Sequence, residues 1–86
     1  MYKAIVTITF KESILDPQGK TAQHALNNLG LDSIQKVRMG KHIEININAN
    51  DKDEAYKTAE EACKKLLANA VMEEYTIEIE EASVNA

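Results

Sequence analysis

A strand pattern gives way to a helix pattern at Phe10-Lys11-Glu12-Ser13-Ile14-Leu15-Asp16-Pro17-Gln18-Gly19. The Asp16 carboxylate can accept amide hydrogens of a first helical turn, and Pro17 at the first helical position loses no helix hydrogen bond. Proline also disfavours the α conformation for the preceding residue, which keeps Asp16 extended. We therefore expect a helix to begin at Pro17, with a loop before it.

This loop, Lys11 to Leu15, carries two opposite charges, a serine and two large aliphatic side chains. Ile14 and Leu15 suit a hydrophobic staple or a cap on the core. The loop has more residue-specific detail than a connector needs, and functional residues concentrate in loops. Both interpretations, a structural cap and a binding surface, stay open at this point.

The residues before the loop alternate between the two faces of a strand. From Tyr2 to Phe10, one face is apolar and the other is mostly polar, which predicts a half-buried strand. After the loop, an apolar stripe with helical spacing follows, made of Ala22, Ala25, Leu26 and Leu29. Gly30 then ends the helix. Because the stripe is narrow and two of its four residues are alanines, we expect this helix to lie close to the sheet.

The segment from Leu31 to Asn50 permits two interpretations. Its apolar residues share one parity from Val37 to Ile47, which favours a single strand bent at Gly40. The alternative is a hairpin whose turn is Gly40-Lys41. A strand of that length would extend beyond a small domain and offer an edge to another chain, which predicts an oligomer.

A second helix and a last strand complete the pattern. Asp51 and Glu54 form a capping box, and the helix runs to about Ala68. The stretch from Val71 to Glu81 alternates again, as expected for a strand. Residues 82–86 have no pattern and are expected to be a loose C-terminal tail.

These elements predict an α+β fold in the order β-α-β-α-β, formed by residues 1–81 as a single domain. We expect a two-layer sandwich with two helices on one face of an antiparallel sheet. The sheet would have three long strands, or four if Gly40 is a hairpin turn.

Charge divides the chain into two halves. Residues 1–42 carry six Lys or Arg and three Asp or Glu, whereas residues 43–86 carry four and eleven. With a net charge of −4, general nucleic-acid binding is not expected. The basic residues of the first half form either a local patch or a solvated rim; they include Lys11, Lys20, Lys36, Arg38 and Lys41.

No apolar run approaches the ~20 residues that cross a bilayer, and Met1 leads directly into a strand pattern. We therefore expect no membrane association and a cytoplasmic protein. Its one cysteine, Cys63, lies in a helical apolar stripe, which predicts a small core residue in a reducing compartment.

Catalytic patterns are missing from the sequence. It has no Gly-rich phosphate loop, no nucleophile motif and no Cys/His metal spacing. Ser13 and Lys11 would need oxyanion donors that the sequence does not supply. We expect no activity, metal or cofactor on this chain itself, and a function exerted through surfaces.

Three segments carry a resemblance to a known family: Lys11-Glu12-Ser13-Ile14-Leu15-Asp16-Pro17-Gln18-Gly19, Val37-Arg38-Met39-Gly40-Lys41-His42-Ile43-Glu44 and Cys63-Lys64-Lys65-Leu66-Leu67-Ala68-Asn69-Ala70-Val71-Met72-Glu73-Glu74-Tyr75. Together they resemble the PurS family, the small subunit of bacterial and archaeal phosphoribosylformylglycinamidine (FGAM) synthase. The resemblance spans nearly the whole chain.

The resemblance implies a non-catalytic subunit that assembles a large synthetase subunit and a glutaminase subunit. Ammonia from glutamine would then convert formylglycinamide ribonucleotide (FGAR) to FGAM in purine biosynthesis. It also implies that ATP and magnesium bind to the large subunit, and that this chain forms a homodimer or a dimer of dimers.

We expect a partner interface at two places in the sequence. The first is the loop and helix start, with Lys11, Glu12, Ser13, Asp16, Gln18 and Gly19; the second contains Arg38, Gly40 and Lys41. An ACT-like domain that binds small molecules is the alternative, and it requires a fourth strand. An RNA-recognition domain is a weaker third choice, because the sheet lacks the aromatic pair on which bases stack.

Overall fold

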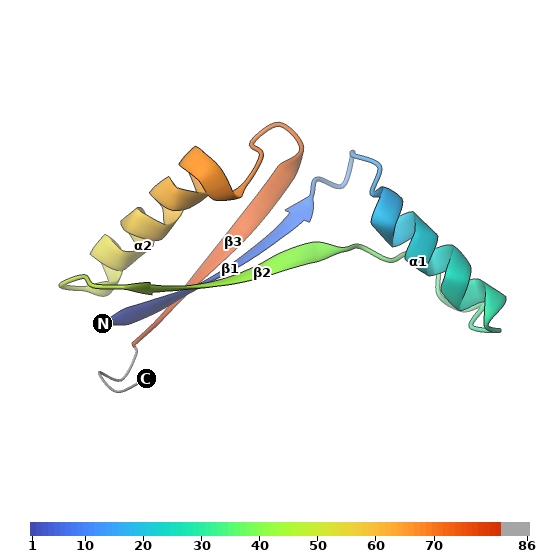
Figure 1. The fold of residues 1–86 in the computed structure, drawn as a ribbon, viewed down its shortest axis with the longest axis horizontal. Coiled ribbons are helices and arrows are strands. Elements are labelled where there is room, and N and C mark those ends of the chain that lie inside the picture. The colour runs from blue at the N-terminus through green and yellow to red at the C-terminus, as the bar shows by residue number, and fades with distance from the viewer. Residues whose placement is uncertain (82–86) are drawn as a thin grey trace.

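The computed structural model describes residues 1–81, and the predicted tail, residues 82–86, lies outside this part of the chain. The elements follow the order β-α-β-α-β, as predicted: β1 (Tyr2–Phe10), α1 (Pro17–Asn28), β2 (Gly40–Ile47), α2 (Lys52–Ala62) with a final π-helical turn η1 (Cys63–Leu67), and β3 (Glu73–Glu81) (Figure 1).

The three strands form one antiparallel sheet in the order β2-β1-β3. The register places Val6 of the central strand between Ile43 and Ile77, so that apolar residues of equal parity share a face. The α+β class and the three antiparallel strands are confirmed. A fourth strand, which a hairpin at Gly40 would create, does not occur within residues 1–81.

Helix α2 covers the apolar face of the sheet. Small side chains on the helix, Ala55, Ala59 and Cys63, are completely buried. They allow the helix to approach the sheet closely, and they pack in two adjoining clusters around Ala4, Val6, Ile8 and Ile47. The core of the protein therefore lies between α2 and the sheet.

The last turn of this helix is widened. The Ala68 amide donates to the Cys63 carbonyl at 3.0 Å, which is the i→i+5 bond of a π-helix. Cys63 is a core residue, as the sequence predicted, and burial raises the pKa of its thiol. The Cys63 thiol is therefore protonated at neutral pH.

Helix α1 lies beyond the end of the sheet (Figure 1). The prediction that both helices cover one face is wrong for α1, because it makes no extensive contact with any strand. Its polar residues bind the following segment instead: Asp16 accepts from the Met39 amide, and Asn27 donates to the Leu31 and Ile34 carbonyls. These bonds direct the helix along residues 29–39.

Strand β2 begins at Gly40, which pairs with Thr9 near the end of β1. The predicted bent strand from Val37 is therefore too long. Because Thr9 faces Gly40, Met39 would face Phe10, the last residue of β1, and residues 37–38 extend beyond it without a neighbouring strand among residues 1–81. The alternation of apolar side chains therefore starts at Val37, but the hydrogen-bonded strand starts only at Gly40.

The molecule is consequently elongated, with extents of 50 × 30 × 15 Å and a radius of gyration of 16.5 Å. A compact chain of this length would have a radius of gyration of about 12 Å. We call the sheet with α2 and η1 the body, and residues 17–39 the arm. Lys11 to Asp16 form the junction loop between them.

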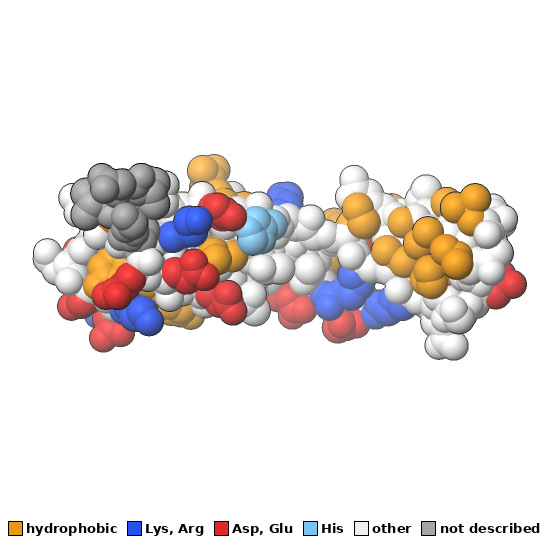
Figure 2. Space-filling model, turned by 90° about the horizontal axis from the view of Figure 1, so that it is seen from below, with side chains coloured by type: hydrophobic (Ala, Val, Ile, Leu, Met, Phe, Trp, Pro, Cys, Tyr) orange, Lys and Arg blue, Asp and Glu red, His pale blue; other side chains and the backbone are white. Residues whose placement is uncertain are grey.

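Among residues 1–81, no helix lies over the face of the sheet opposite α2 (Figure 1 and Figure 2). Charged side chains lie over the sheet in this view, while hydrophobic side chains gather over the arm. The expected polar second face is therefore present. None of the helices within residues 1–81 has the length and apolar character that crossing a membrane requires.

Candidate functional site

The junction loop is fixed at its end by Asp16. Its Oδ1 accepts from the Gly19 amide at 2.9 Å, which confirms the predicted helix cap. Its Oδ2 accepts from the Met39 amide at 2.8 Å, so that one carboxylate joins the start of α1 to the start of β2. These amide hydrogen bonds lower the pKa of Asp16.

Position 19 must be a glycine because there is no room for a side chain. It is buried, and a Cβ there would collide with the Val37 carbonyl and would lie 2.8 Å from Asp16 Oδ2. The backbone of α1 therefore lies directly against the returning segment.

The other end of α1 is also held by local bonds. Gly30 has a φ of 92°, and the Leu31 amide donates to the Leu26 carbonyl at 3.2 Å, while the Gly30 amide donates to the Asn27 carbonyl. This is a Schellman motif, and it confirms Gly30 as the end of the helix. The arm is thus shaped by caps at both ends of its helix.

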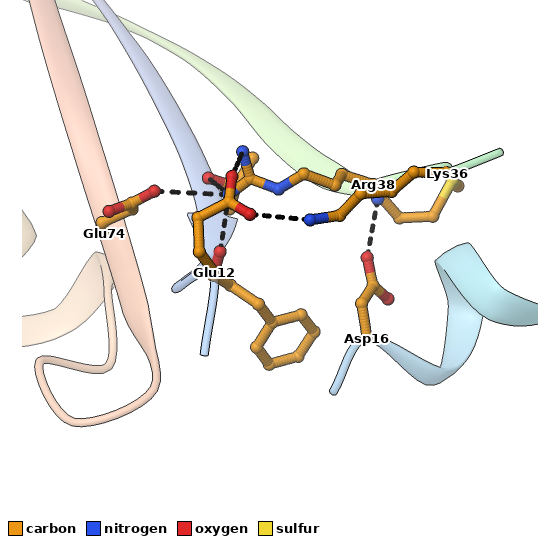
Figure 3. Close-up of polar contacts among 8 residues, drawn as sticks. Glu12, Asp16, Lys36, Arg38 and Glu74 are labelled. Atoms are coloured by element: carbon orange, nitrogen blue, oxygen red, sulfur yellow. Dashed lines mark hydrogen bonds and ion pairs between the residues drawn. The ribbon is translucent and has the colours of Figure 1, made fainter. Parts of the chain in front are cut away.

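Arg38 joins the arm to the body (Figure 3). Its Nη2 donates to the Phe10 carbonyl at 2.7 Å and to Thr9 Oγ1 at 3.0 Å, both at the end of β1. Its guanidinium also pairs with Glu12 at 3.0 Å and with Glu74 at 3.3 Å. One side chain thus connects the arm, the central strand, the junction loop and β3.

Lys36 completes this group through Glu12, with a distance of 2.7 Å between Nζ and Oε2. We call Glu12, Lys36, Arg38 and Glu74 the clasp. The hydrogen bond from Lys36 and the charge of Arg38 lower the pKa of Glu12, which is therefore ionised at neutral pH. The side chains are well exposed, so each ion pair alone stabilises the fold little.

A cavity of about 460 Å³ lies between the junction loop, α1 and residues 35–38. We call it the junction cavity. Five of the predicted interface residues line it, namely Lys11, Glu12, Ser13, Asp16 and Arg38. Lys20 and Lys36 also contribute to its wall, so that four members of the predicted basic patch meet here.

Of the four remaining interface candidates, Gly19 is buried and the other three lie on the other side of the junction. Gln18, Gly40 and Lys41 line a second cavity of about 350 Å³, and Lys41 is 3.9 Å from Glu73. A Cβ at Gly40 would lie 2.5 Å from the Ile8 carbonyl oxygen. Gly40 is therefore needed for close approach of the backbones, and its φ is not positive.

The sequence prediction placed Lys36 in the basic patch and omitted it from the interface. The sequence pattern that could have identified Lys36 is its spacing of two residues from Arg38, because this spacing puts both side chains on one side of an extended segment. Thr9, the Phe10 carbonyl and Glu74 were also missed. They are up to 36 residues from Arg38 in the sequence, and no local pattern connects them.

Within residues 1–81, no group of three or more His, Cys, Asp or Glu side chains is arranged to hold a metal ion. The acidic stretch from Asn50 to Glu54 starts α2, and Asp51 Oδ1 accepts from the Glu54 amide at 2.8 Å. Capping therefore accounts for Asp51, as predicted. At the junction, Glu12 forms ion pairs with Lys36 and Arg38, and Asp16 caps α1.

Comparisons with known proteins match this architecture. The family model described as "PurS: Phosphoribosylformylglycinamidine (FGAM) synthase" matches residues 3–81. The chain is 47% identical over 81 residues to phosphoribosylformylglycinamidine synthase subunit PurS of Bacillus subtilis, covering 94% of this chain and 95% of that protein.

Solved structures give the same result. The crystal structure of Methanocaldococcus jannaschii PurS has a TM-score of 0.87 and 42% identity, covering 96% of this chain and 100% of that one. A chain in the structure of PurLQS from Thermotoga maritima has a TM-score of 0.83 and 31% identity, covering 91% and 95%. This chain belongs to the PurS family of FGAM synthase.

Proposed function

We propose that this protein is the small subunit of an FGAM synthase and assembles the large synthetase subunit with the glutaminase subunit. Glutamine-derived ammonia would then be used to convert FGAR to FGAM in purine biosynthesis. The observation that carries this proposal is the match to the PurS family over residues 3–81. The structural similarity to a chain of PurLQS supports it.

The proposed contribution of this chain is assembly without catalysis of its own. At the junction, Glu12 is bound to Lys36 and Arg38, and Asp16 is bound to two backbone amides. Groups held in this way suit a structural role better than proton transfer. ATP and magnesium would bind to the large subunit, and the complex would act in the cytoplasm.

We place the interface with the larger subunits at the junction. The predicted interface residues that line its two cavities come from the junction loop, α1, β2 and the segment before β2. Leu15 in this loop is a large aliphatic side chain that is 71% exposed. A partner surface would remove this side chain from water.

A second copy of the chain is the other proposed partner, as a dimer or a dimer of dimers. Within residues 1–81, β2 and β3 are both edge strands, because β1 lies between them. The arm also exposes apolar side chains, among them Leu29 at 77%. Strand pairing or arm packing between copies would cover these surfaces.

The alternative ACT-like function has no such support. It required a fourth strand, and Gly40 begins β2 instead of forming a hairpin turn.

The test is FGAM synthase activity of the large and glutaminase subunits from the same organism, with and without this chain. We expect the chain to restore the glutamine-dependent reaction and to change the ammonia-supplied reaction less. Restoration of neither reaction would contradict the proposal. Equal restoration of both would contradict coupling of the two active sites and would indicate activation of the synthetase alone.

A further inference from the structure

The junction cavity differs in charge from the rest of the molecule. Its wall contains four of the ten Lys and Arg residues of the chain and two of the fourteen Asp and Glu residues. The chain as a whole has a net charge of −4. The cavity is therefore a local positive region on an acidic protein.

The two carboxylates of the cavity already have partners. Glu12 is paired with Lys36 and Arg38, and both oxygens of Asp16 accept backbone amides. Lys11 and Lys20, by contrast, form no ion pair with any residue of the described part of the chain. Two cationic side chains at the wall are thus available to a carboxylate from outside.

The cavity also has an apolar side. Phe10, Ile14 and Val37 are half-buried in its wall, and the more exposed Leu15 lies beside them. A small inorganic anion would use the lysines but would leave these side chains in contact with water. A peptide segment that has an acidic residue next to an apolar one would use both kinds of surface.

We propose that the junction cavity receives an acidic segment of a partner subunit, whose carboxylates pair with Lys11 and Lys20 while a neighbouring apolar side chain packs on Leu15. This inference rests on the proposed function, since it specifies the chemistry by which the chain docks. Charges at such a rim accelerate association and make it depend on salt.

The test measures the dissociation constant between this chain and the large and glutaminase subunits at two salt concentrations. The test variant is the double charge reversal Lys11→Glu with Lys20→Glu. The control is Lys52→Glu with Lys57→Glu in α2, which changes the net charge equally on the body. Far-ultraviolet circular dichroism and thermal unfolding check that both variants are folded.

We expect the test variant to bind at least about tenfold more weakly, because like charges replace complementary ones. Its binding should also depend less on salt, while the control stays within about twofold of the wild-type chain. Equal weakening of both variants would overturn the inference, since it would show a general charge effect. Unchanged binding of the test variant would overturn it as well.

A second measurement addresses a small ligand. Inorganic phosphate is titrated into the isotope-labelled chain, and the backbone amide signals of the junction are followed by NMR. We expect no saturable shift at millimolar phosphate. Saturation there, together with unchanged assembly of the test variant, would assign the cavity to a phosphate-bearing ligand and overturn the inference. Failure of the wild-type chain to assemble would instead contradict the proposed function itself.

Discussion

The body and the arm are built by different interactions. In the body, side chains of the sheet and of α2 with η1, such as Val6, Ile8 and Cys63, are almost completely removed from water. Among residues 11–39, Gly19 alone is buried, and the arm keeps its shape through helix caps and the clasp. Apolar burial is usually the larger source of stability. The body is therefore the stable scaffold, and we propose that the arm is the part presented to partners.

Charge follows the same division. Residues 11–39 carry four Lys or Arg and three Asp or Glu, whereas the other described residues carry six and eleven. An excess of negative charge on the body favours solubility. The slightly basic charge of the arm and junction agrees with the acidic partner segment proposed for the junction cavity.

The largest difference in stability is expected between the truncation of a buried side chain in the body and the truncation of an exposed one in the arm. Ile8→Ala in the body, where Ile8 is 1% exposed, should lower the free energy of unfolding by about 2–5 kcal/mol. Leu29→Ala in the arm should change it by less than about 0.5 kcal/mol, because Leu29 is 77% exposed. Urea unfolding measures both. Equal costs would show that the arm belongs to the same cooperative core.

Gly19→Ala should loosen the arm selectively. The added methyl group would collide with the Val37 carbonyl, and we expect a cost of about 1–3 kcal/mol for the packing of the arm. Hydrogen exchange should become faster in residues 17–39 and stay unchanged in the strands. Gln18→Ala is the control, since Gln18 is exposed. Equally increased exchange in β1 would contradict the separation of the two regions.

Asp16→Ala removes the cap and the bond to Met39, and we expect a loss of about 0.5–2 kcal/mol from the stability of the arm. Asp32→Ala is the matched control, because Asp32 lies in the same region and is exposed. Hydrogen exchange of the α1 amides measures the difference. If the two variants exchange at the same rates, the helix cap and the bond from Asp16 to Met39 are not needed for the stability of the arm.

The Asp16 carboxylate also makes the stability of the arm depend on pH. The pKa of Asp16 is lower in the folded chain than in the unfolded chain, where it is about 4. Its contribution is therefore complete above this pH and is lost as the pH falls toward the folded pKa. Below pH 4 the arm should lose exchange protection before the body, and Asp16→Ala should remove most of this dependence.

The smallest effect is expected from Arg38→Lys. Lysine cannot reproduce the set of contacts with Phe10, Glu12 and Glu74. Because the ion pairs are exposed, we expect the free energy of unfolding to fall by less than about 1 kcal/mol. High salt should reduce the difference in the free energy of unfolding between the variant and the original chain. The control is Lys65→Ala, which breaks the surface pair with Glu61.

The body was predictable from the sequence because period-2 alternation and a helical stripe are local signals. The strands within Tyr2 to Phe10 and Val71 to Glu81 were predicted from their alternation, and Cys63 was assigned to the core. The position of α1 was not predictable, because an apolar stripe shows which side of a helix is less polar but not what covers it. Ala25 and Leu29, expected against the sheet, are exposed.

The candidate site was predicted in part for a similar reason. Asp16, Gly19 and Gly30 have local roles in capping and turning, and the sequence signals them directly. The clasp depends on Arg38 meeting Glu12 and Glu74, and these contacts arise only after the strands have paired. The start of β2 at Gly40 likewise depends on where β1 ends.

The most direct test of the division into scaffold and docking arm is hydrogen exchange of this chain with and without the large and glutaminase subunits. On assembly, we expect protection to increase in residues 11–39 and to change little in the central strand β1, which is already protected. Increased protection confined to α2, with no change in residues 11–39, would contradict this account.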